Sequence, residues 1–330
     1  MSELDRRRFL QGTLAASLTA LAGSCRASPS WDPSAYQKGE RSRVAVLASP
    51  DYGSHLVDLI GRGLRLLGTP VGGKRVVLKP NLVEFDPAGV INTHPALIEA
   101  AADAFLGLGA REVIVAEGPG HRRDNEYVLT ASGLHAMLRE KRIRYVDLNY
   151  DDTRLVALRS RFTDLGQLRL PCTVIDADLL VSMPKLKTHH WAGVTLSMKN
   201  LFGIVPGAIY GWPKNLLHWA GLPGSILDIN GSLAVPRLAI VDGIVGMEGN
   251  GPIQGEPRSS GVVVMGDDLV AVDSTCARLM GIDPHQVDYL DSAGRFLGNV
   301  ATERITQIGE QLDGYRQQYR LLASFERLRG

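Results

Sequence analysis

Residues 181–206 read VSMPKLKTHHWAGVTLSMKNLFGIVP, and this stretch decides both the expected fold class and the place of the candidate site. Three lysines, two histidines, a tryptophan and an asparagine stand between two apolar runs that we expect to be buried. A buried strand that ends in a loop rich in hydrogen-bond donors is the usual construction of a ligand site in an α/β protein. We therefore expect the chemistry of the chain to lie here.

Short aliphatic runs recur on both sides of this stretch. Their apolarity is nearly continuous rather than alternating, which is typical of strands buried on both faces of a parallel sheet. The predicted strands cover residues 43–48, 75–78, 112–116, 145–148, 179–183, 238–241 and 262–265.

Helical patterns alternate with these runs. Apolar side chains recur at helix spacing, and a cap-and-proline signal precedes the Ala-rich segment. The predicted helices cover residues 56–67, 96–108 and 269–280, and a last edge strand over 305–309 is followed by a helix from about residue 314. This alternation predicts an α/β fold, with a largely parallel twisted sheet and helices on both faces, built as one domain or as two lobes.

The first thirty residues have the pattern of an export signal. Arg6-Arg7 and the following Phe9-Leu10 match the twin-arginine pattern, and the weakly apolar segment over 12–23 is too short to anchor in a bilayer. The run LAGSC, which ends at Cys25, approximates a lipoprotein cleavage site. Two alternatives stay open: a simple cleavable signal, or a lipidated Cys25. Both predict export by the twin-arginine machinery to the periplasm or another extracytoplasmic place, the second with a lipid anchor.

The predicted organisation has four parts. They are a signal peptide over 1–30, a linker over 31–42, an α/β domain over 43–310 and a helical tail over 311–330. A chain of this length can bury a substantial core.

Composition excludes two classes of protein. The balance of 36 basic and 35 acidic residues argues against a nucleic-acid binder, for which a positive field is expected. Beyond the signal only Cys172 and Cys276 remain, with no C-x-x-C spacing, so the chain lacks the ligands for an iron–sulfur cluster or a Cys-rich zinc site. These two cysteines form a disulfide or are small buried apolar residues, and we favour burial.

Polar side chains follow several predicted strands at the point where each strand ends. Lys79 and Asn81 follow one strand, Glu117 and His121 the next, and Asp242 a later one. Because the carboxyl ends of parallel strands meet at one edge of a sheet, we expect these groups to converge there. The alternative is that they are ordinary solvated loop residues.

The central stretch adds a helix argument. If residues 194–205 are helical, Lys199 and Asn200 lie opposite an apolar stripe and face a cleft, unless they simply face water. The stripe consists of Val194, Met198, Leu201 and Val205. With Lys185 and Lys187 upstream, three ammonium groups converge, which favours a small anionic ligand and lowers the pKa of a lysine toward that of a useful base.

Two histidines and a tryptophan complete the stretch. His189 and His190 are adjacent, so on an extended chain only one of them is expected to reach the site. Trp191 supplies either a flat apolar wall for a ring-bearing ligand or part of a small core that holds the Gly/Pro/Trp-rich loop over 203–224.

A metal site is a minority alternative. Its candidate ligands are Glu117, His121 and Asp242, with His189 and Glu248 in support. No compact H-x-H or H-x-x-x-H spacing preforms such a site.

Several blocks of the sequence resemble one known family. MPKLKTH at 183–189 and MKNLFG at 198–203 are joined by LKPN at 78–81, THP at 93–95, EG at 117–118, DG at 242–243, GNGP at 249–252 and DDLVAVD at 267–273. Together they resemble the signature of domain of unknown function family 362, over residues 44–310. The resemblance implies the fold and the place of the site rather than a reaction. Many members carry a ferredoxin-like module, but this chain lacks the cysteines, so no iron–sulfur cofactor is carried over.

Three functional hypotheses follow. The first is an exported enzyme acting on a small anionic substrate, which Lys185, Lys187 and Lys199 bind or polarise while His189 or Glu117 moves protons. Its substrate contacts are Lys79, Asn81, Asn200, Asp242 and Trp191. The second is a non-catalytic ligand-binding or accessory protein, and the third is a metal-dependent hydrolase.

Overall fold

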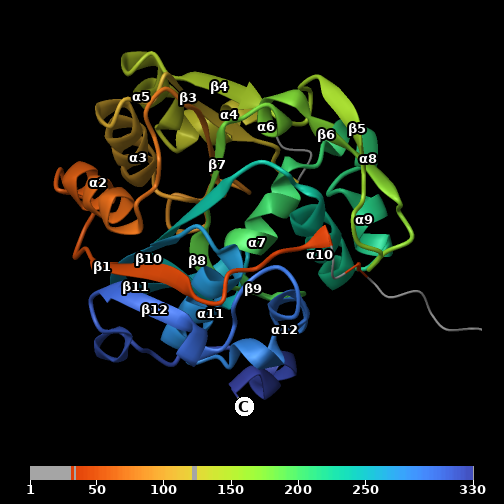
Figure 1. The fold of residues 1–330 in the computed structure, drawn as a ribbon. Coiled ribbons are helices and arrows are strands. Elements are labelled where there is room, and N and C mark those ends of the chain that lie inside the picture. The colour runs from red at the N-terminus through yellow and green to blue at the C-terminus, as the bar shows by residue number, and fades with distance from the viewer. Residues whose placement is uncertain (1–30, 33–34, 121–124, 330) are drawn as a thin grey trace, which may run out of the picture. The chain divides into compact units, whose positions relative to one another are not determined.

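A long antiparallel hairpin, β10 (Arg237–Asn250) and β11 (Gln254–Gly266), forms the middle of the main sheet (Figure 1). The structure is a computed structural model that describes residues 31–32, 35–120 and 125–329. The twin-arginine pair, Cys25 and His121 therefore lie outside the described residues. From Trp31 on, the chain clusters into one compact unit, which favours the single-domain alternative.

The main sheet contains ten of the described strands. Its order is β12-β1-β11-β10-β7-β2-β3-β4, and β8 pairs with β10 and with β9. The pairs between β10, β7, β2, β3 and β4 are parallel, as are β8–β10 and β1–β12. The bounds are β1 Ser42–Ala48, β2 Arg75–Pro80, β3 Glu112–Glu117, β4 Arg144–Asp147, β7 Leu179–Met183, β8 Lys185–His189, β9 Gly193–Thr195 and β12 Ile305–Gly309. A separate hairpin joins β5 (Thr153–Ala157) to β6 (Gln167–Pro171).

Helices cover both faces of this sheet, as predicted. Alternate residues of β1 divide between two cores: Ala45 and Leu47 pack with α2 to α5, whereas Val44 and Val46 pack with α7, α10, α11 and α12. The bounds are α2 Leu56–Leu67, α3 Pro95–Gly107, α4 Asn125–Ala131, α5 Leu134–Glu140, α6 Cys172–Ile175, α7 Ser197–Asn200, α8 Gly207–Tyr210, α9 Asn215–Trp219, α10 Leu222–Ser232, α11 Leu269–Leu279 and α12 Asp288–Gly294. Short 3-10 turns are η2 Leu201–Ile204, η3 Pro284–Gln286, η4 Thr302–Arg304, η5 Leu312–Gly314 and η6 Ala323–Arg329.

Three expected elements differ from the structure. The helix expected over 194–205 is instead strand β9, the single turn α7 and the 3-10 turn η2, although all four stripe residues are buried. The loop expected over 203–224 contains the short helices α8 and α9. The tail beyond β12 holds 3-10 turns where a longer helix was expected, because the backbone N–H groups of Gln317 and Tyr319 donate to Leu279 O and Met280 O at 2.7 and 3.0 Å instead of within a helix.

Two further observations concern the cysteines and the length of the helices. Cys172 and Cys276 are both free; Cys276 is buried, as we predicted, whereas Cys172 is only partly buried. Among the described residues, no helix combines the length and the apolarity that crossing a bilayer requires.

Candidate functional site

A cleft of about 200 Å³ opens at the carboxyl ends of β2, β3 and β8, beside α7 and η2. Eight of the predicted site residues line it. They are Lys79, Asn81, Glu117, Lys187, His189, Trp191, Lys199 and Asn200. The geometry therefore brings together the strand ends that carry Lys79, Asn81 and Glu117, whereas the expected convergence does not extend to Asp242.

The base of the cleft is a buried ion pair. Lys79 Nζ lies 2.6 Å from Glu117 Oε2, and its other hydrogens go to Pro80 O at 2.8 Å and Asn200 Oδ1 at 3.0 Å. The Glu117 carboxylate also accepts from the backbone N–H groups of Leu82 and Gly118. Burial lowers the pKa of Lys79, and Glu117 opposes that shift. This pair is saturated, so we assign it a positioning role rather than proton transfer.

Gly203 is required by this ion pair. A Cβ at residue 203 would lie 2.7 Å from Lys79 Nζ and 2.8 Å from Glu117 Oε1, closer than real Cβ contacts. Any side chain at this position would therefore push the pair apart, which explains the glycine that ends the KNLFG run.

The turn α7 is held from beneath by Asp273 of α11. The backbone N–H groups of Ser197 and Met198 donate to its two carboxylate oxygens at 2.7 and 2.9 Å, and the Ser197 hydroxyl donates as well. Burial raises the pKa of Asp273 to about 7, while these hydrogen bonds lower it. Asp273 positions the next residues, Lys199 and Asn200, at the cleft.

Lys199 is the uncommitted lysine of the cleft. Its Nζ has no hydrogen-bond partner among the described residues and lies 4.9 Å from the centroid of the Phe202 ring. Burial, and then the charge of Lys79, lowers the pKa of Lys199 to about 8, against the opposing charge of Glu117. An amine with this pKa accepts and returns protons near neutral pH.

Lys187 and His189 are donors from β8. Lys187 Nζ donates to Ile91 O at 2.8 Å and Pro252 O at 3.2 Å, and burial holds its pKa well below the ordinary value. His189 Nδ1 accepts from the N–H groups of Trp191 and Ala192 at 3.0 and 3.2 Å. Burial also holds the His189 pKa well below its usual range. The imidazole is therefore neutral, with its hydrogen on Nε2 as a donor.

Two buried polar atoms at the cleft lack partners. Asn81 Oδ1 and Thr195 Oγ1 make no hydrogen bond within the described part of the chain, and both residues line the cleft. Such atoms are rare in folded proteins, because a buried polar group without a partner costs about 1–3 kcal/mol. Both atoms are therefore available to bond with a molecule in the cleft.

Sequence reasoning missed Lys214. It adopts a left-handed backbone with φ of 69°, and its buried Nζ donates to Gly118 O, Gly203 O and Val205 O at 2.7, 2.9 and 2.6 Å. Burial lowers its pKa to about 7. The residue ties the start of α9 to the wall of the cleft. A lysine in a glycine-like conformation has no sequence signature, since its role depends on three carbonyls from distant segments.

The structure places Lys185 and Asp242 outside the cleft. Their side chains pair at 2.7 Å, and Tyr52 contacts both, donating to Asp242 Oδ1 at 2.8 Å. Val245 O and His94 N complete the network at 3.1 and 2.9 Å. The physical reason is a register shift between β10 and β8: Lys185 pairs with Asp242, but Lys187 pairs with Met247. The two lysines therefore reach different surroundings.

The described residues support neither the metal alternative nor the aromatic-wall alternative. Over the described ranges, no group of three or more His, Cys, Asp or Glu side chains could hold a metal ion, and Glu117 and Asp242 belong to separate networks. Trp191 is 59% exposed at the rim and makes edge contacts with His190 and His218, whose ring centroids lie at 4.7 and 5.3 Å.

Comparison with known proteins gives a family and one curated relative. The family model described as "Domain of unknown function (DUF362)" matches residues 76–278. A thylakoid-associated protein of Synechocystis sp. is 29% identical over 281 residues, which cover 80% of this chain and 82% of that protein.

Two solved structures are similar in part. A protein from Thermotoga maritima matches with a TM-score of 0.40 and 15% identity, covering 67% of this chain and 58% of its own. The lactate racemase apoprotein from Thermoanaerobacterium thermosaccharolyticum matches with a TM-score of 0.34 and 16% identity, covering 61% and 51%. The chain thus spans little more than half the length of either solved chain.

Proposed function

The chain belongs to the DUF362 family, and we propose that it is an enzyme that acts on a small organic anion in the cleft by acid–base chemistry centred on Lys199. The observation that carries the proposal is the uncommitted Lys199 amine beside two unpartnered buried polar atoms. Groups left without partners by the fold are available to a ligand, and maintaining them costs stability.

The charge of the cleft supports an anion. Of the described residues that line it, four are lysines and only Glu117 is acidic. The lysines lower one another's pKa values, because each ammonium group raises the cost of charging the next. An anion in the cleft relieves this repulsion.

The unpartnered atoms define the ligand further. Asn81 Oδ1 is an acceptor only, so it needs a hydroxyl or N–H on the ligand, while Thr195 Oγ1 can donate or accept. Apolar lining from Val83, Phe202 and Ile253 suits a short carbon skeleton. The ligand class is therefore a carboxylate or phosphate ester that carries a hydroxyl group.

Roles follow from which atoms are free. Lys187 and the Nε2–H of His189 donate to the anionic group, Asn81 and Thr195 bind the hydroxyl, and Lys199 accepts and returns a proton. Glu117, Lys79 and Asn200 hold the cleft floor in place, and Asp273 positions the turn that carries Lys199.

The test uses matched pairs of small anions in deuterated water, followed by proton NMR. The pairs are malate with succinate, and glycerol 3-phosphate with propyl phosphate, each differing by hydroxyl groups. We expect a hydroxyl-bearing compound to be consumed or to exchange a C–H for deuterium, and its partner to stay unchanged. Lys199→Arg keeps a cation but removes the base, so it should bind and not react.

The main alternative is a non-catalytic ligand-binding or accessory protein, which the exposed Trp191 at the rim favours. Binding of the hydroxyl-bearing anions without any chemical change would establish that alternative. If these compounds neither bind nor react, both the enzyme proposal and the ligand-binding alternative are wrong.

We further propose export by the twin-arginine route, supported by Arg6-Arg7 and the short apolar run that follows. A relative is named as thylakoid-associated. Fusing residues 1–30 to a reporter should give export that depends on the twin-arginine machinery and is lost when both arginines become lysine. Cytoplasmic retention of the unaltered fusion would contradict this.

A further inference from the structure

The short helices α8 and α9 and the turn between β8 and β9 expose large hydrophobic side chains. Among the described residues, eight such side chains are exposed, and four of them lie on these three elements. They are Trp191 at 59%, Ile209 at 48%, Leu216 at 42% and Trp219 at 79%. We call these four residues the tryptophan face. Single exposed hydrophobic residues are ordinary, but a group that includes two tryptophans indicates a surface that binds a partner.

The four residues lie on neighbouring elements. The Trp191 ring contacts the ring of His218 on α9, with the two centroids 5.3 Å apart. Leu216 and Trp219 are three residues apart on α9 and share its exposed side, while Leu217 faces the core. Helix α8, which carries the fourth residue, packs against α9. The tryptophan face therefore spans both helices and reaches the rim of the cleft, which Trp191 and His218 line.

Two arginines of the hairpin β5–β6 lie beside the tryptophan face. Figure 1 shows this hairpin next to α8, and the backbone N–H of Arg169 donates to the Tyr210 hydroxyl of α8 at 2.7 Å. Arg161, in the loop of the hairpin, and Arg169 are exposed, and neither guanidinium has a hydrogen-bond or ion-pair partner among the described residues. Free guanidinium groups beside exposed tryptophans suit a partner whose surface carries phosphate groups.

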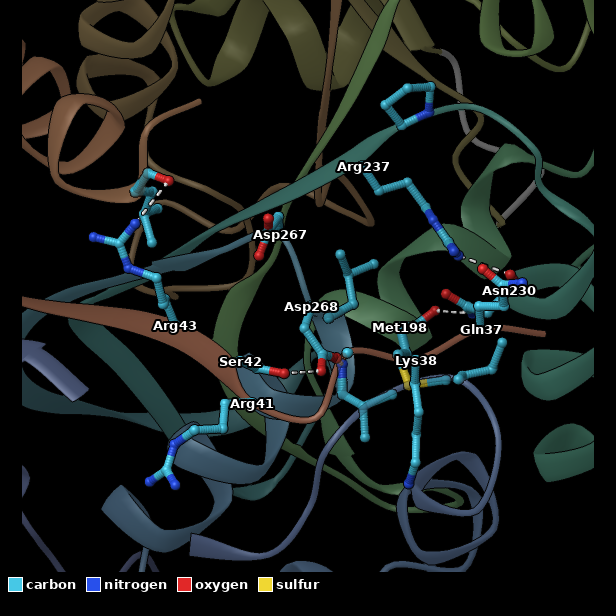
Figure 2. Close-up of a pocket in the computed structure, with 16 residues that line it drawn as sticks. Gln37, Lys38, Arg41, Ser42, Arg43, Met198, Asn230, Arg237, Asp267 and Asp268 are labelled. Atoms are coloured by element: carbon cyan, nitrogen blue, oxygen red, sulfur yellow. Dashed lines mark hydrogen bonds between the residues drawn. The ribbon is translucent and has the colours of Figure 1, made fainter. Parts of the chain in front are cut away.

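The chain enters the folded unit close to this face. The Trp31 ring stacks on the Phe162 ring, with the centroids 5.6 Å apart. The backbone of Phe162 lies against Gly224 of α10, where an added Cβ would be 2.8 Å from Phe162 O, and α10 follows α9 directly in the chain. From Trp31 the chain continues along a cavity of about 480 Å³, which residues 37–43 help to line, and into β1 (Figure 2). Residue 31 therefore lies on the side of the unit where α9 ends.

This entry point favours a membrane as the partner. Trp31 is six residues after Cys25, and six residues span at most about 22 Å. If the leader is of the lipoprotein kind, a lipid on Cys25 holds the bilayer within this distance of Trp31. A second copy of the chain has no such link to this side of the unit.

We propose that the tryptophan face docks on a lipid bilayer that carries anionic headgroups, with the rim of the cleft turned toward the membrane. Tryptophan suits the boundary between headgroups and acyl chains, because it combines a large apolar ring system with one N–H donor. Arg161 and Arg169 bind lipid phosphates beside it. The docking rests on the export proposed above and is independent of the reaction proposed for the cleft.

The first test measures binding of the full chain to vesicles of phosphatidylethanolamine and phosphatidylglycerol by flotation. Leu216→Ser with Trp219→Ser should weaken binding at least about tenfold, because two apolar side chains lose their contact with the bilayer. The matched control is Leu106→Ser with Tyr127→Ser, which changes side chains that are 43% and 54% exposed on α3 and α4. The control should bind as the wild type does. All these proteins share residues 1–30, so a difference between them comes from the folded unit.

Tryptophan fluorescence tests the contact itself. Lipids brominated on their acyl chains quench a tryptophan whose ring enters the bilayer. Vesicles that contain them should quench the wild type, and the quenching should fall in Trp191→Phe with Trp219→Phe. This variant retains Trp31 and Trp212, which are half-buried.

The contribution of the arginines has its own variant. Arg161→Gln with Arg169→Gln should lower the affinity for vesicles that contain phosphatidylglycerol by about fivefold or more, because each arginine near an anionic surface contributes about 1 kcal/mol. Binding to vesicles of phosphatidylcholine alone should not change. An equal loss on both kinds of vesicle would show that these arginines do not bind anionic headgroups.

Two results would overturn the docking proposal. One is equal vesicle binding by the two serine double variants, and the other is equal quenching of the wild type and the phenylalanine variant when both are bound to vesicles. Self-association that Leu216→Ser with Trp219→Ser abolishes, without vesicle binding, would assign the face to a second copy of the chain instead. None of these results affects the proposed reaction, which is tested on small anions in solution, or the proposed export, which is tested on a reporter fusion.

Discussion

Two buried lysine–carboxylate pairs each link two strands of the main sheet, the first β2 with β3 and the second β8 with β10. The two pairs differ in their surroundings. Lys79–Glu117 at 2.6 Å and Lys185–Asp242 at 2.7 Å have almost the same length and burial. Around the first pair stand Lys199, Asn81 and Thr195, which have unused groups. Around the second, a tyrosine hydroxyl, a carbonyl and an N–H complete the network. A buried ion pair alone therefore indicates a structural role, whereas neighbouring side chains without hydrogen-bond partners indicate the candidate site.

The largest expected effect is on stability when a pair is broken. Lys185→Met leaves Asp242 buried without a cation, which should lower the free energy of unfolding by about 3–5 kcal/mol. Lys79→Met should cost less, because Glu117 still faces Lys187, Lys199 and Lys214. Urea unfolding of both variants measures the difference.

The reverse order of these two losses would contradict the proposed difference between the pairs. As a second check, Lys185→Met should keep any stabilisation by hydroxyl-bearing anions, since the pair lies outside the cleft. Loss of that response in a folded Lys185→Met protein would place Lys185 in the site after all.

Two threonines of the β8–β9 hairpin extend the comparison to smaller expected changes in stability. The Thr188 hydroxyl donates to Gly249 O at 2.8 Å, whereas Thr195 Oγ1 has no partner within the described part of the chain. Thr188→Val should therefore destabilise the protein by about 1–3 kcal/mol, while Thr195→Val should leave it unchanged or more stable. A similar loss in both, measured by thermal unfolding, would mean that Thr195 has a structural partner.

A further expected effect, on rate rather than on stability, is a pH dependence of the proposed reaction. The neutral Lys199 amine is the base, and its pKa of about 8 lies below the ordinary lysine value because of burial. The rate should rise about tenfold per pH unit up to roughly pH 8 and then level off. His189 should not contribute, because its pKa is held well below this window.

Measuring the rate with the reacting anion as a function of pH checks whether the rate rises as predicted. A rate that falls as the pH rises through 8 would show that Lys199 acts as an ammonium group instead. The Lys199→Arg variant should show no reaction at any pH.

The strands and the place of the site could be predicted because both depend on local composition. Buried parallel strands carry continuous aliphatic runs, so β7 at Leu179–Met183 agrees with its predicted bounds, and β3 at Glu112–Glu117 differs by one residue. The ends of such strands meet at one edge, which brings Lys79 and Glu117 to the same cleft, and the turn α7 adds Lys199.

Other features could not be predicted, because they depend on contacts between distant segments. The register shift between β8 and β10 separates Lys185 from Lys187 and leaves no mark in the sequence. The helix over 194–205 breaks into shorter elements, since Asp273 fixes the start of α7 at Ser197. The left-handed backbone of Lys214 is stabilised by three carbonyls that only the folded chain brings together.

The most direct test of the central claim is the thermal midpoint of the wild type and of Thr195→Val with malate or glycerol 3-phosphate. A ligand at 100 times its dissociation constant stabilises the native state by about 2.7 kcal/mol, which gives a visible shift. We predict a clear shift for the wild type and a smaller one for Thr195→Val, which loses one contact to the ligand, although the variant alone is at least as stable. Equal shifts in the two proteins, or no shift in either, would contradict the claim that the cleft is the binding site.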